Sequence, residues 1–155
     1  MDRPTIYEYA GGAPAFLAVA TDFHARCLAD PVLEHPFSHP GQNPDHVTRL
    51  AAYWGEVFGG PDSGLDQSAV LYLHAGTGAE TDLGERFLSC FDAAVAAADL
   101  PDDPDLRAAM HDYMRWAVDE VMALSPKGSV VPPGLSAPRW DWTGLHRAAD
   151  PPPPA

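Results

Sequence analysis

His74 is the residue whose setting most directly suggests chemistry. It lies in the segment LYLHAGTG (71–78), and no Cys, Asp, Glu or second His stands within three positions of it. A zinc site needs three or four protein ligands, whereas a haem iron can be held by one imidazole because the porphyrin supplies four nitrogens. A core histidine needs only a hydrogen-bond partner. The segment alone leaves these three interpretations open.

Other segments supply the side chains that a flat apolar cofactor needs. Burying a porphyrin requires aromatic and aliphatic walls, together with a few polar groups directed at the metal and its ligand. The candidates lie on three predicted helices and one loop: Phe23, His24, Phe37, His46, Leu50, Phe87 and Phe91. This set has the composition of such a pocket.

Glycine and proline divide the chain into helical segments. The first predicted helix runs from Pro14 to the stop at Asp30-Pro31, with apolar residues at helical spacing. The second starts at Asn43-Pro44 and ends at residues 59–61, and the third follows the capping-box spacing of residues 77–80. The fourth runs from Asp103-Pro104 to Ser125. No stretch alternates convincingly as a strand would, so the predicted fold is all-α with four substantial helices.

Composition limits the classes of protein and partner. A chain of 155 residues fits a single core, and no run approaches the roughly 18 apolar residues of a membrane span. The net charge of −13 argues against nucleic acid or an anionic membrane as partner. The N-terminus lacks the pattern of a signal peptide, so we expect a cytoplasmic protein. Cys27 and Cys90 are expected to be buried thiols rather than a disulfide.

The chain divides into three parts by composition. Residues 1–125 form the predicted helical domain. Residues 126–147 are too rich in proline for a helix, yet they contain apolar side chains that we expect to pack across the helices as an extended arm: Val130, Val131, Leu135, Trp140 and Trp142. Residues 148–155 are a proline-rich tail that we expect to be disordered.

Several motifs, taken in order, resemble those of the truncated haemoglobins, the small bacterial globins with a two-over-two helical sandwich. The chain is closest to their group II. The motifs are YEYAGG (7–12), DFHARCLADPVL (22–33), HVTRLAAYWGEVFGGP (46–61) and RFLSCFDAA (86–94), with His74 placed 13 residues before Phe87. The resemblance implies a two-over-two globin fold over most of the chain.

The resemblance also implies haem b (iron protoporphyrin IX) as cofactor and assigns roles residue by residue. His74 corresponds to the proximal histidine that ligates the iron. Phe37 corresponds to the loop aromatic that wedges against the porphyrin. His46 corresponds to the first ligand-facing position of the distal helix, and Leu50 to the apolar residue one turn later. Phe91 would belong to the pocket wall.

Some positions differ from the family pattern. His24 stands where the family usually has a distal tyrosine, so with His46 the distal side would have two imidazoles able to donate hydrogen bonds or to bind iron as a sixth ligand. Phe87 replaces a common tryptophan and so removes an indole donor. The usual arginine before the proximal histidine is missing, and Arg49 and Tyr72 are the candidates to meet a haem propionate.

Three functions remain open from the sequence. The first is reversible binding of O2, and also NO and CO, at iron. The second is enzymatic: an NO dioxygenase served by an external reductase, or a peroxidase. The third is a globin-like module without haem, in which His24, His46 and His74 would hold zinc or non-haem iron or the chain would bind a protein partner. The protein is expected to be a monomer or a homodimer.

Overall fold

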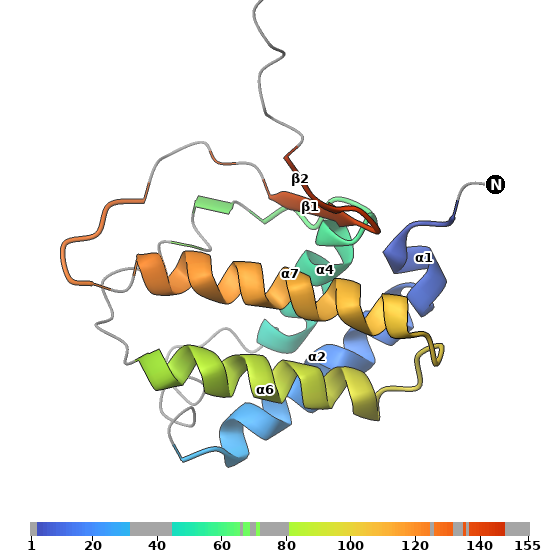
Figure 1. The fold of residues 1–155 in the computed structure, drawn as a ribbon, viewed down its shortest axis with the longest axis horizontal. Coiled ribbons are helices and arrows are strands. Elements are labelled where there is room, and N and C mark those ends of the chain that lie inside the picture. The colour runs from blue at the N-terminus through green and yellow to red at the C-terminus, as the bar shows by residue number, and fades with distance from the viewer. Residues whose placement is uncertain are drawn as a thin grey trace, which may run out of the picture.

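The computed structural model describes residues 3–31, 45–65, 67, 68, 71, 81–124, 126–131, 135 and 137–147. In chain order the elements are α1 (Ile6–Ala10), α2 (Ala13–Ala29), α4 (His46–Val57), α6 (Thr81–Ala97), α7 (Pro104–Ala123), β1 (Pro138–Asp141) and β2 (Gly144–Arg147). Helices α6 and α7 run side by side, and α2 and α4 form a second layer behind them (Figure 1). Helix α2 contacts both α4 and α6, so it joins the two layers.

The starts of α2 and α7 follow from local chemistry, as the sequence predicts. Pro14 lies in the first turn of α2, where its missing N–H costs no hydrogen bond. Asp103 caps α7 by accepting a hydrogen bond from the backbone N–H of Asp105 at 2.8 Å, and Pro104 follows it. Helix α4 begins at His46 in the described residues. The predicted caps at 43–44 and 77–80 lie outside them.

Helix α1 is an element that the sequence analysis did not predict. Its five residues are too few to show a helical period. Its start is set by Thr5, whose side chain accepts a hydrogen bond from the backbone N–H of Glu8 at 3.1 Å. Its end is set by Gly11, whose φ of 121° suits only glycine. The helix buries Ile6 completely against the remaining helices.

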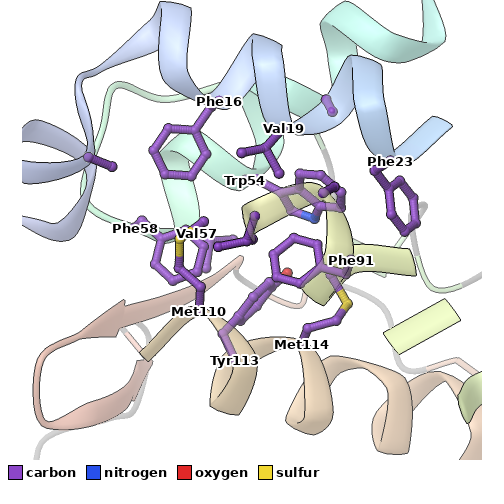
Figure 2. Close-up of a cluster of buried hydrophobic side chains, with 14 of the residues drawn as sticks. Phe16, Val19, Phe23, Trp54, Val57, Phe58, Phe91, Met110, Tyr113 and Met114 are labelled. Atoms are coloured by element: carbon purple, nitrogen blue, oxygen red, sulfur yellow. The ribbon is translucent and has the colours of Figure 1, made fainter. Parts of the chain in front are cut away.

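The core lies between the two layers of helices. Figure 2 shows side chains of α2 and α4 packed against those of α6 and α7. The largest fully buried residues of the core are Tyr113, Phe16, Phe23, Phe58, Phe91, Ile6, Leu106 and Met110. The aromatic rings of the core meet mostly edge to face, so the interior is dense with aromatic contacts.

The C-terminal arm folds into a hairpin where the sequence predicted only extended chain. Strands β1 and β2 pair antiparallel, with Trp140 opposite Leu145. The turn is held by Asp141, whose carboxylate accepts hydrogen bonds from the backbone N–H of Thr143 at 2.7 Å and from its hydroxyl at 2.6 Å. Two strands of four residues are too short to display alternation, so periodicity could not reveal them.

Contacts with distant segments fasten the hairpin to the helices. The indole N–H of Trp142 donates to the carbonyl of Pro4 at 2.8 Å, and the Arg3 guanidinium lies 3.8 Å from the Trp142 ring centroid. Arg139 donates to the carbonyl of Glu56 at 2.6 Å. Hence the arm ties the N-terminus to the end of α4. The predicted disordered tail, residues 148–155, lies outside the described residues.

Across the described residues, every helix is too short or too polar to cross a lipid bilayer.

Candidate functional site

Two of the predicted site residues, His24 and His46, lie next to each other in the fold. His24 is near the middle of α2, and His46 is the first residue of α4. Their ring centroids are 5.5 Å apart with the planes inclined by 53°. The Nε2 atom of each ring is buried. The packing of α2 against α4 therefore brings together two imidazoles that are distant in the sequence.

Aromatic side chains of three helices pack together around Phe23, the residue before His24. Phe23 precedes His24 and meets Phe87 edge to face at 4.8 Å and Trp54 at 5.2 Å. Phe91, fully buried, meets Trp54 at 5.0 Å. These rings come from α2, α4 and α6, so three helices form one apolar wall; its place in a haem pocket stays a prediction. Trp54 belongs to this wall although it was not among the candidate site residues.

The other predicted residues on α4 differ in their exposure. Leu50 is partly buried and packs against the core, one turn after His46. Arg49 is exposed, and its backbone N–H bonds to the carbonyl of Asp45 at 2.9 Å. The roles of both residues in a haem pocket stay predictions. Phe37, Tyr72 and His74 lie outside the described residues, so their predicted roles stay predictions.

A buried polar network lies in the core, and the sequence analysis missed it. The Tyr53 hydroxyl donates to the side-chain oxygen of Gln67, and the Tyr113 hydroxyl is near enough to influence the pKa of Tyr53. Burial raises the pKa of Tyr53 to about 12 and also raises the pKa of Tyr113. The Glu120 carboxylate, with a buried Oε2, adds to both shifts because its charge opposes a second negative charge nearby.

This network had one recognisable sign in the sequence. Tyr113 falls within the apolar stripe of the last predicted helix, and a buried tyrosine hydroxyl requires a hydrogen-bond partner. The partners come from α4 and from residue 67, so helical periodicity could not identify them. Through Tyr53 and Gln67 the network connects α4 to residue 67, and Tyr113 brings α7 next to it.

A zinc site needs three or four converging protein ligands. Among the described residues, no group of three or more His, Cys, Asp or Glu side chains comes close enough to hold a metal ion. His24 and His46 supply two nitrogen donors, and His74, the third ligand of the zinc alternative, lies outside the described residues. Two imidazoles with buried Nε2 atoms, together with apolar and aromatic side chains on the same helices, fit a haem pocket.

Comparisons with known proteins agree with this interpretation. A family model described as bacterial-like globin matches residues 5–120. The structure resembles the haemoglobin of the thermophilic phototrophic bacterium Chloroflexus aurantiacus, with 28% identity and a TM-score of 0.65 over 81% of this chain and 100% of that chain. It also resembles a thermostable haemoglobin from the actinobacterium Thermobifida fusca, with 25% identity and a TM-score of 0.62 over 76% of this chain and 96% of that chain.

The fold is matched further by a more distant structure. The group II truncated haemoglobin from Bacillus anthracis has 14% identity and a TM-score of 0.69, over 86% of this chain and 98% of that chain. No match is found among curated proteins. The family model and these structures confirm the predicted truncated, two-over-two globin fold.

Proposed function

The chain belongs to the bacterial-like globin family, and we propose that it is a haem protein which reversibly binds O2, NO and CO through an iron held by His74. Membership of the globins implies a haem cofactor, and haem b is the form proposed here. The observation that carries the proposal is the pair formed by His24 and His46, whose ring centroids lie 5.5 Å apart and whose Nε2 atoms are buried. Such a pair suits the side of a haem pocket on which a gas binds.

The proposal gives each candidate residue a role. When bound, haem supplies an iron atom that can take a diatomic gas. His74 would hold the iron, and Phe37 would pack against the porphyrin. Arg49 and Tyr72 would face the propionates, where a cation and a phenol can each donate to a carboxylate.

The two imidazoles would stabilise the gas ligand by hydrogen bonding. A neutral imidazole carries one N–H, so His24 or His46 can donate from Nε2 to a partly negative ligand atom when the proton is on that nitrogen. A hydrogen bond of this kind is stronger in a water-poor site than in solvent. O2, which gains negative charge when bound, would therefore benefit more than CO.

The apolar wall would keep water out of the site. Phe87 meets Phe23 at 4.8 Å, and Leu50 packs against the core beside His46. Excluding water limits the supply of protons to the ligand and preserves the hydrogen bonds from the imidazoles. Because Phe87 replaces a tryptophan common in relatives, position 87 offers no indole donor, and His24 and His46 are the donors that we assign.

An absorbance spectrum and a haem titration would test the proposal directly. We expect purified protein to show a sharp Soret band with one haem per chain, and His74→Ala to lose that band. His111→Ala is the matched control, since His111 lies on α7 and pairs with Asp92 at the surface. A colourless wild-type protein that holds zinc would overturn the proposal and favour the haem-free alternative.

A second candidate function is peroxidase chemistry at the same site. It is favoured by the proximity of His24 and His46, because one imidazole can accept a proton from peroxide while the other donates one. Steady-state oxidation of a peroxidase dye would detect it, and it should fall in His24→Leu or His46→Leu. Stopped-flow mixing with NO would test the remaining alternative, an NO dioxygenase that depends on an external reductase.

A further inference from the structure

The two cysteines of the chain meet across the interface of α2 and α6. Cys27 lies one turn after Phe23 on α2, and Cys90 lies one turn after Phe87 on α6. The Phe23 and Phe87 rings are in contact at 4.8 Å. On the other side of Cys27, Asp30 bonds the guanidinium of Arg86 at 3.2 Å. Two contacts thus hold the helices together around the cysteines.

The two thiols are also near enough to influence each other's ionisation. Burial raises the pKa of the Cys27 thiol, and the neighbouring Cys90 raises it further. Both side chains are reduced in the structure; Cys27 is fully buried and Cys90 is partly exposed. Neighbouring thiols on two packed helices are the arrangement from which a disulfide can form, and the partly exposed Cys90 gives an oxidant access.

We propose that Cys27 and Cys90 are an oxidisable pair, which a hydroperoxide converts into an intrachain disulfide joining α2 to α6. This modification is independent of the haem assignment. It would covalently link the helix that carries His24 to the helix that carries Phe87.

The chemistry proceeds in two balanced steps. The Cys90 thiolate attacks one oxygen of the hydroperoxide, the O–O bond breaks, and Cys90 becomes a sulfenic acid while water or an alcohol leaves. The Cys27 sulfur then attacks the sulfenic sulfur, the S–O bond breaks, and water leaves with the proton of Cys27. Two thiols lose two electrons in total, and the hydroperoxide gains them.

The surroundings make Cys90 a slow-reacting thiol rather than a highly activated one. Burial is the largest influence and raises the pKa of Cys90. The carboxylate of Asp30 raises it further, whereas the neighbouring Cys27 and the charges of Arg26 and Arg86 lower it. Because only the thiolate attacks the oxidant, disulfide formation should be faster at higher pH.

The test is oxidation of the haem-loaded wild-type protein and of two isosteric variants, Cys27→Ser and Cys90→Ser. One arm uses equimolar hydrogen peroxide, and the other uses diamide, a thiol oxidant that does not react as a peroxide at a metal. Thiol titration, intact mass and tryptic peptide mapping are the readouts, with circular dichroism as the check that each variant is folded.

In both arms we expect the wild type to lose both thiols together and its intact mass to fall by two hydrogen atoms. Tryptic digestion should yield one pair of linked peptides, which reduction separates. Cys90→Ser should keep its buried thiol. Cys27→Ser should stop at an oxygen adduct with peroxide. Oxygen adducts or linked dimers in place of an intrachain disulfide, in either arm of the wild type, would overturn the proposal even if a variant fails to fold.

Discussion

The imidazole rings of His24 and His46 lie with their centroids 5.5 Å apart, although one belongs to the middle of α2 and the other to the start of α4. Both rings bury their Nε2 atoms. An imidazole N–H in a water-poor environment is an effective hydrogen-bond donor. Two predictions about gas binding depend on this pair.

Removing either imidazole should weaken O2 binding. We expect His24→Leu and His46→Leu each to speed O2 dissociation about fivefold, because one hydrogen bond contributes about 1 kcal/mol. CO dissociation should change less, since CO is the weaker acceptor. Stopped-flow ligand replacement measures both rates. His111→Leu, a surface change on α7, should leave them unaltered. If all three variants match the wild type, neither imidazole is a donor.

The same pair determines the expected coordination of the iron. If His46 binds as a sixth ligand, the ferrous protein without gas should show low-spin visible bands, and His46→Leu should convert them to high-spin bands. His24→Leu is the companion variant, because it identifies which imidazole binds. High-spin, five-coordinate bands in the ferrous wild type would exclude internal ligation and leave both residues as hydrogen-bond donors.

Arg139 should contribute measurably to stability through the hairpin. Its guanidinium donates to the carbonyl of Glu56 at 2.6 Å, in a partly buried position that joins β1 to α4. We expect Arg139→Ala to lower the free energy of unfolding by about 1–3 kcal/mol, because it leaves a carbonyl without its charged donor. Urea denaturation followed by circular dichroism measures this loss.

The control for Arg139 is another arginine in a solvated pair. Arg107 bonds Asp102 at 2.7 Å, and both side chains are largely exposed. Exposed ion pairs contribute about 0–1 kcal/mol. Arg107→Ala should therefore lower the free energy of unfolding clearly less than Arg139→Ala does. Equal losses in the two variants would mean that the contact between the hairpin and α4 adds no specific stability.

The pair of Tyr9 and Asp103 should make stability depend on acid pH. The Tyr9 hydroxyl donates to Asp103 at 2.7 Å and, together with the backbone N–H of Asp105, holds the pKa of Asp103 below its usual value of 3.8. A carboxylate with a lowered pKa stabilises the fold fully above that usual value. Its contribution is lost as the pH falls through the lowered pKa.

The corresponding measurement is urea denaturation of Tyr9→Phe and the wild type from neutral to acid pH. We expect Tyr9→Phe to be the less stable protein at neutral pH and the difference to shrink on acidification through the pKa of Asp103. Tyr7→Phe serves as control, because the Tyr7 ring stacks on Phe16 and its contribution to stability should not depend on the ionisation of Asp103. If the stability difference between Tyr9→Phe and the wild type is constant with pH, Tyr9 does not act through Asp103.

Much of the helical framework could be predicted from local sequence. Pro14 begins α2 and Asp103-Pro104 begins α7 as expected, because capping and the φ angle of proline act within one turn. The apolar spacing also placed Phe23 and Phe91 in the core correctly. The hairpin at 138–147 could not be predicted, since its short strands are held by distant partners such as Pro4 and Glu56.

The candidate site also combines features that local sequence predicted with features that depend on helix packing. Residue types identified His24, His46, Leu50 and the aromatic residues as a set, and the resemblance to truncated haemoglobins suggested their roles. The proximity of Cys27 to Cys90, and that of Tyr53 to Tyr113, had no counterpart in any local pattern. Each joins two helices whose relative position depends on packing.

The sequence by itself determined the four long helical segments and which of their faces are apolar, because both properties depend on neighbours within about one turn. Only the tertiary structure decided which side chains meet: His24 with His46, Cys27 with Cys90, and the hairpin with the helices. The physical reason is that side chains on different helices become neighbours only when the helices pack at a particular crossing, and that crossing depends on the fit of the whole core.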